Sequence, residues 1–129
     1  MIAFIDIDGC MAVSGNPAFT PAAIEAVRLL AANGFQIVLH STARADGRLE
    51  DVLDRFGNRG ITLFGWVDST EPSKAKAIAG WLDENYETWP RVIVIDDDPI
   101  DLRGVTHIRC NPSVGLTVED VRKAMGVTS

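Results

Sequence analysis

The segment VIVIDDDP, residues 92–99, decides the fold. An aliphatic run of this kind is typical of a strand buried on both faces of a parallel sheet. The strand leads directly into Asp96, Asp97 and Asp98. Two like charges about 4 Å apart repel by roughly 4 kcal/mol at an effective dielectric of about 20. Three successive carboxylates at a strand end therefore indicate a bound cation or a site of chemistry.

Strands and helices are predicted to alternate along the rest of the chain. Further apolar, β-prone segments lie at 1–7, 35–41, 61–67 and 106–110. Segments with apolar residues at helical spacing lie between the strands, and their predicted caps are Thr20 (before Pro21), Asp46, Ser73 and Thr117. This alternation predicts right-handed crossovers and a parallel sheet with helices on both faces.

Three of the predicted strands end in polar residues. These ends are Asp6 to Asp8, His40 to Arg44, and Asp96 to Asp98. In parallel α/β sheets, ligands bind beyond the carboxyl ends of the strands. We therefore expect one site at this edge of the sheet, with His40 and His107 as packed or surface histidines rather than ligands.

Composition limits the classes of function. The chain has 129 residues, which predicts a single domain over 1–129. A net charge of −6 argues against a face for duplex DNA. No apolar run approaches the roughly 20 residues of a membrane span, and the N-terminus lacks the pattern of a signal peptide. Cys10 and Cys110 give no disulfide framework, so we expect a cytoplasmic protein with reduced thiols.

The segment FIDIDGC, residues 4–10, carries a second acidic pattern. Asp6 and Asp8 are two positions apart and can project to one side of a strand, and Gly9 allows a sharp turn after them. One carboxylate can act as a nucleophile while the other handles a proton, and both suit Mg²⁺. The alternative is that Asp8 only starts a turn and Asp6 caps nearby backbone.

Asp6-x-Asp8-Gly9 closing the first strand resembles the first motif of the haloacid dehalogenase (HAD) superfamily, which consists mostly of phosphohydrolases. The three further motifs of that family have counterparts here in the same order: Ser41 (or Thr42) in IVLHSTAR, Lys74 (or Lys76) in PSKAKAIAGWL, and Asp96-Asp97. The resemblance implies an α/β, Rossmann-like three-layer sandwich. Its central parallel sheet would have about five strands in the order 3-2-1-4-5.

The resemblance also implies a role for each matching residue. Asp6 would be the nucleophile that forms an aspartyl-phosphate. Asp8 would protonate the leaving alkoxide and then activate water. Ser41 would bind the phosphoryl oxygens, and Lys74 would neutralise charge.

The same resemblance implies a Mg²⁺ site. The metal would be held by Asp6, the backbone carbonyl of Asp8 and one acid of the Asp96–Asp98 run. Asp97 is the favoured direct ligand, and Asp96 would then lie behind it. An acid at Asp8 favours phosphoryl transfer, because family members that remove halide lack one there. Phosphatase and phosphotransferase remain alternatives.

The spacing of the motifs leaves no room for an inserted cap domain. Asp8 and Ser41 are 33 positions apart, as are Ser41 and Lys74, and each interval is filled by predicted helix and strand. An uncapped site is open, so it can accept phosphate on a large substrate.

A narrower likeness concerns the small HAD domains of RNA-repair proteins and phages. It is carried by VLHSTAR, AIAGWL, VIVIDDDP and VGLTVEDVRKAM. This resemblance implies a phosphorylated nucleotide or nucleic-acid end as substrate, with Gly9, Thr42 and Arg44 as contacts. The alternatives are that Arg44 is a solvated loop charge, and that the domain binds Mg²⁺ or a phosphoryl ligand without turnover.

Overall fold

The structure is a computed structural model that describes residues 1–40, 49–67 and 72–126. Its strands are β1 (Ile2–Ile5), β2 (Gln36–Leu39), β3 (Leu63–Trp66), β4 (Val92–Asp96) and β5 (Thr106–Arg109). Its helices are α1 (Pro21–Ala32), α2 (Leu49–Gly57), α3 (Lys74–Asn85) and α4 (Val118–Met125). All strand pairs are parallel, and the order is β3-β2-β1-β4-β5. The predicted fold class and strand order are confirmed.

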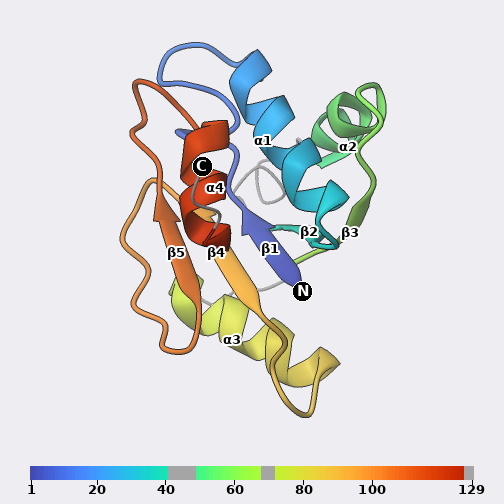
Figure 1. The fold of residues 1–129 in the computed structure, drawn as a ribbon, viewed down its shortest axis with the longest axis vertical. Helices are drawn as coiled ribbons and strands as arrows, with labels where there is room; N and C mark the ends of the chain where they lie inside the picture. Colours follow the sequence, from blue (N-terminus) through green and yellow to red (C-terminus); the bar gives the residue numbers. More distant parts are fainter. Residues whose placement is uncertain (41–48, 68–71, 127–129) are drawn as a thin grey trace.

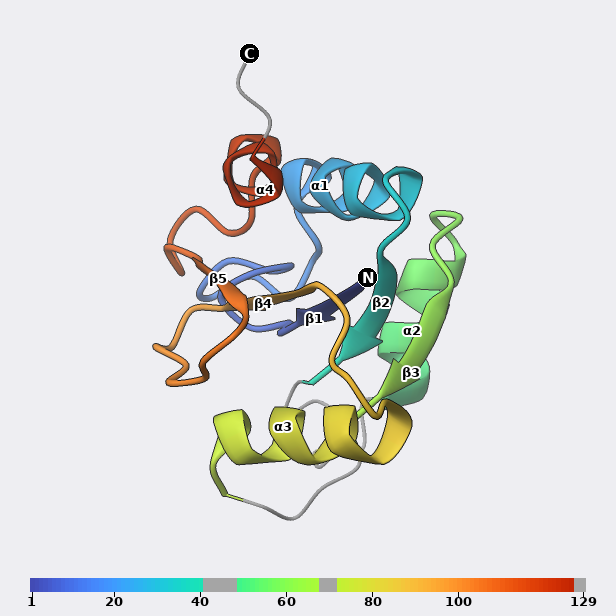
Figure 2. The ribbon, with the colours of Figure 1, turned by 60° about the horizontal axis from the view of Figure 1, so that its bottom comes forward.

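The sheet lies between two layers of helices. Figure 2 shows α1 and α4 on one face and α3 on the other. Alternate residues of β1 serve the two cores: Ala3 and Ile5 pack with α1, α2 and α4, whereas Ile2 and Phe4 pack against α3. Because helices cover both faces, every residue of β1 is buried. This explains why the strand is continuously apolar.

The register of the central strands brings the predicted site residues together. Ile5 of β1 pairs with Leu39 of β2 on one side and with Ile95 of β4 on the other. The next residues, Asp6, His40 and Asp96, therefore lie together at the ends of three adjacent strands. These strands, β1, β2 and β4, are in the middle of the sheet (Figure 1). A parallel sheet thus places acids that are ninety positions apart in the sequence at one edge.

The predicted helix starts are confirmed wherever the structure describes them. Hydroxyl oxygens accept hydrogen bonds from backbone N–H groups at three caps: Thr20 from Ala23, Ser73 from Lys76 and Thr117 from Asp120. At Thr117 the Asp120 carboxylate also accepts from the cap residue's own N–H, which completes a capping box. The predicted cap Asp46 lies outside the described residues.

Strand boundaries are shorter than the sequence pattern predicted. The segment 61–67 was expected to be one strand, but β3 begins at Leu63. Ile61 is instead buried, and its N–H donates to the carbonyl of Phe56 at 3.0 Å. An apolar residue that closes a helix end has the same sequence pattern as one that starts a strand.

Two of the three tryptophans pack against the core, and both cysteines are buried. Trp81 packs edge-on against Phe4, with ring centroids 5.4 Å apart, and Trp89 packs against the same core, whereas Trp66 is 39% exposed. Cys10 and Cys110 are free and buried. Within the described ranges, no helix is long and apolar enough to cross a membrane.

Candidate active site

Three carboxylates meet where β1 and β4 end. Asp6 follows β1 and is 4% exposed, and Asp96 ends β4 and is fully buried. One carboxylate oxygen each from Asp6, Asp96 and Asp97 lies within 4.8 Å of the other two. Burying ionised carboxylates is costly unless they are paired or bind a metal. We call these three residues the acidic cluster.

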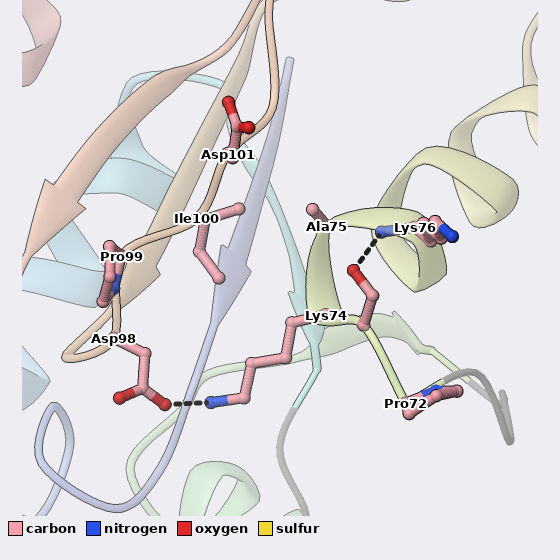
Figure 3. Close-up of a pocket in the computed structure, with 9 residues that line it drawn as sticks. Pro72, Lys74, Ala75, Lys76, Asp98, Pro99, Ile100 and Asp101 are labelled. Carbon is pink, nitrogen blue, oxygen red and sulfur yellow. Dashed lines mark hydrogen bonds and ion pairs between the residues drawn. The ribbon is translucent and has the colours of Figure 1, made fainter.

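Lys74 brings positive charge to the acidic cluster from the start of α3. It is the first residue of α3, placed there by the Ser73 cap. Its Nζ lies 3.1 Å from Asp96 Oδ2, 3.6 Å from Asp6 Oδ2 and 3.2 Å from Asp98 Oδ2. Figure 3 shows Lys74 reaching toward Asp98, whereas Lys76 points away. Of the two candidate lysines, Lys74 is therefore the one that contacts the acids.

The pKa values show that the negative charge of the acidic cluster exceeds the positive charge of Lys74. Burial raises the pKa of Asp6 to about 7, and repulsion by Asp96 adds to the shift. Burial would lower the pKa of Lys74, but attraction by Asp6 and Asp96 outweighs it and raises that pKa above its usual value. Burial and the neighbouring Asp96 also raise the pKa of Asp97. One ammonium does not balance the acidic cluster.

Asp96 differs from the other two acids. Burial would raise its pKa, but the backbone N–H of Asp98, with His40 and Lys74, lowers it. The N–H of Asp98 donates to Asp96 Oδ1 at 2.8 Å. Asp96 is therefore an anion held in place by the protein itself. The acidic cluster, with its oxygen donors and its excess of negative charge, fits a hard divalent cation such as Mg²⁺.

Asp8 has a different environment from Asp6. It is exposed and, with Gly9 and Asp97, lines a cavity of about 370 Å³ beside residues 13–17. One residue of the Asp-x-Asp pair is thus buried beside Lys74, and the other opens toward solvent. Carboxylates in unequal environments can take unequal chemical roles.

The loop after Asp8 is held by backbone contacts. Gly9 N–H donates to the carbonyl of Ala12 at 2.8 Å, and Leu116 N–H donates to the carbonyl of Cys10 at 2.8 Å. Gly9 has a φ of +86°, and a Cβ there would lie 2.5 Å from Asp97 Oδ2. Glycine avoids both the strain of a positive φ and a clash with the Asp97 carboxylate, which lies directly against the backbone.

Replacing Gly9 by alanine is expected to displace Asp97, lower stability by about 1–3 kcal/mol and weaken Mg²⁺ binding. Gly15→Ala is the matched control, because its φ is +80° but no atom lies within 4 Å of an added Cβ. Calorimetric Mg²⁺ titration of both variants separates the clash from backbone strain. Equal affinities in the two variants would contradict the steric argument.

The sequence singled out the three-aspartate run but gave no role to Asp98. In the structure its carboxylate pairs with Lys74 and its N–H holds Asp96. Asp residues commonly form a turn in which the side-chain oxygen accepts from the backbone N–H two residues later. Asp96 and Asp98 form such a turn, and Pro99 follows Asp98. Asp98 also lines a groove of about 520 Å³ with Lys74, Lys76 and Asp101 (Figure 3).

The sequence model of the HAD domain in Swiss Army Knife RNA repair proteins matches residues 2–121. The chain belongs to this family. The match spans all four motifs, although Ser41, Thr42 and Arg44 lie outside the described residues. No curated protein matches the chain significantly.

A solved structure shares the fold of this HAD domain. The crystal structure of a hypothetical protein from Xanthomonas campestris superposes with a TM-score of 0.57 and 19% sequence identity. The alignment covers 98% of the present chain and 84% of the other. At this identity the likeness concerns the fold alone.

Proposed function

We propose that this HAD domain is a Mg²⁺-dependent phosphomonoesterase that acts through an aspartyl-phosphate on Asp6. The observation that carries the proposal is a buried Asp6 with Lys74 Nζ 3.6 Å from its Oδ2, inside a group of carboxylates that fits a cation. An Asp nucleophile at this position needs both features, because a phosphate ester brings further negative charge.

The surroundings of each residue suggest its role in the reaction. Asp6 attacks phosphorus, and the bond from phosphorus to the leaving oxygen breaks. Asp8, on the exposed side, gives its proton to the departing alkoxide. Lys74 offsets charge on Asp6 and the phosphoryl group. Mg²⁺ held by Asp6, Asp97 and the backbone carbonyl of Asp8 would supply the remaining neutralisation, and Asp96 would stay bound to Lys74 behind it.

The second half of the reaction releases phosphate. Asp8, now ionised, takes a proton from water, whose oxygen attacks phosphorus and frees the Asp6 carboxylate. A hydroxyl of another molecule could replace water, which would make the enzyme a phosphotransferase. The exposed position of Asp8 suits either acceptor.

The proposed substrate is a phosphorylated nucleotide or nucleic-acid end. The open cavity beside Asp8 and the groove beside Lys74 leave both sides of the site accessible to a large molecule. The family occurs in RNA-repair proteins. Ser41, Thr42 and the backbone of Gly9 would then contact the phosphoryl group. Arg44 would contact a neighbouring phosphate. The two free thiols fit a reducing compartment, so we place the enzyme in the cytoplasm.

The test is phosphate release from a panel of esters with Mg²⁺ and with EDTA. The panel holds p-nitrophenyl phosphate, mononucleotides, and oligonucleotides with a 5′- or 3′-phosphate, each beside its unphosphorylated control. We expect release with Mg²⁺, a loss of at least about 100-fold in EDTA, and faster release from oligonucleotides. Mg²⁺ binding without turnover of any ester would instead favour a non-catalytic binding domain.

A further inference from the structure

His40 spans the three central strand ends. Its backbone N–H donates to the carbonyl of Ile5 in β1 at 3.2 Å. Its side chain crosses β1 and places Nε2 3.1 Å from the carbonyl oxygen of Ile95 in β4. One residue at the end of β2 therefore contacts both strands that carry the acidic cluster.

The Ile95 carbonyl is the junction of these contacts. It also accepts the N–H of Asp6 at 3.0 Å. Because a carbonyl can only accept, Nε2 of His40 carries the proton in this contact. The same nitrogen lies 3.7 Å from Asp96 Oδ2. His40 thus fixes the peptide that joins Ile95 to Asp96, next to the backbone of Asp6.

Stability alone does not account for a histidine here. The His40 side chain is 2% exposed, and its Nδ1 is buried with no hydrogen-bond partner among the described residues. A buried unpaired acceptor is costly. Without the imidazole, the Ile95 carbonyl would still accept from Asp6. An apolar residue packed against Phe4, whose ring meets His40 edge-on, would remove the unpaired Nδ1, which offsets the loss of the Nε2 contacts with Ile95 and Asp96.

We propose that His40 is a positioning residue: by fixing the Ile95–Asp96 peptide against Asp6, it sets where Asp6 and the following Asp97 stand for metal binding, with Asp96 behind them. The proposal rests on the proposed function, because it assigns the acidic cluster to Mg²⁺. His40 touches neither substrate nor metal in this arrangement. It acts through the Ile95–Asp96 peptide, as residues behind metal ligands do elsewhere, and losing such partners typically costs 10–100-fold in metal affinity or activity.

The test is calorimetric titration of the full chain with Mg²⁺, which needs no turnover. His40→Leu removes the donor, and we expect Mg²⁺ affinity to fall about 10–100-fold while the melting temperature in EDTA stays equal or rises. His40→Gln keeps an amide N–H at the reach of Nε2, so affinity should return to within about 3-fold of wild type. His40→Asn is too short and should behave like His40→Leu.

Val38→Ala is the matched control. Val38 lies on the same face of β2, is buried against the α3 core and does not belong to the site. Its loss should lower the melting temperature and leave Mg²⁺ affinity unchanged. If His40→Leu does not fold, the contrast between His40→Gln and His40→Asn still decides the matter.

Two results would overturn the inference: wild-type Mg²⁺ affinity in His40→Leu or His40→Asn, or equal losses in His40→Gln and His40→Asn. If the three His40 variants change Mg²⁺ affinity as expected but the wild type releases no phosphate from any ester, only the proposed function is overturned. No Mg²⁺ binding by the wild type would overturn both.

Discussion

Replacing Lys74 by methionine is expected to lower kcat/KM for a phosphate ester by roughly 10²–10³-fold and to destabilise the metal-free protein. Lys74 Nζ lies within 3.6 Å of carboxylate oxygens of Asp6, Asp96 and Asp98. Without it, the phosphate ester would meet an uncompensated acidic cluster. Removing one partner of a fully buried charge pair costs about 3–5 kcal/mol; the cost here should be smaller, because the Lys74 side chain is 29% exposed and Asp6 can take up a proton.

Mg²⁺ should recover part of this stability, because the cation would replace some of the missing charge. Unfolding in EDTA and in excess Mg²⁺ measures the difference. Lys76→Met is the matched control with a small ester such as p-nitrophenyl phosphate: Lys76 is on the same helix but is exposed and points away from the acids, so its loss should change neither that activity nor stability by much. Equal effects of the two substitutions would refute the assignment of Lys74.

The alternation of strands and helices and the clustering of acids could be predicted because both follow from patterns along the chain, whereas the strand order came from the resemblance to the HAD superfamily. Continuous apolar segments mark strands covered on both faces, and parallel strands place their following residues at one edge. The prediction that Asp6 and Asp96 lie together needed only these two patterns. Lys74 was found as the counterpart of the third HAD motif, and that resemblance left Lys76 open as the alternative.

Contacts that depend on three-dimensional reach could not be predicted. His40 looked like one more buried residue of an apolar strand, since no pattern shows that its ring crosses β1 to Ile95. Asp98 was visible only as a third acid, although its N–H and carboxylate both hold the site. The closeness of Gly9 to Asp97 likewise arises from a turn against a neighbouring strand.

Asp6→Asn is expected to abolish turnover, by roughly 10⁴-fold or more, while making the metal-free protein more stable at neutral pH. Asparagine is almost the same shape as aspartate but cannot form the acyl phosphate. The gain in stability follows from the raised pKa of Asp6, about 7 against 3.8 for a free side chain. Above pH 7 the wild type must hold a buried charge that the variant lacks.

The sign of the pH dependence distinguishes this explanation from improved packing. Well below pH 3.8, Asp6 is protonated whether the protein is folded or unfolded, so the two proteins should be equally stable. As pH rises toward 7, the unfolded wild type loses its proton first, and its folded state is progressively destabilised relative to Asp6→Asn. The difference should level off above pH 7 at no more than about 4 kcal/mol.

Chemical denaturation in EDTA at several pH values measures this difference. Asp54→Asn, at an exposed position of α2, is the control for removing one negative charge and should show almost none of the effect. A gain in Asp6→Asn that is the same at pH 4 and pH 8 would show that packing, rather than the buried charge, is responsible. A gain in stability of Asp6→Asn that appears only toward neutral pH, together with lost turnover, would give the Asp6 carboxylate two effects. Its charge would destabilise the folded protein, and the same group would be the nucleophile of the proposed reaction.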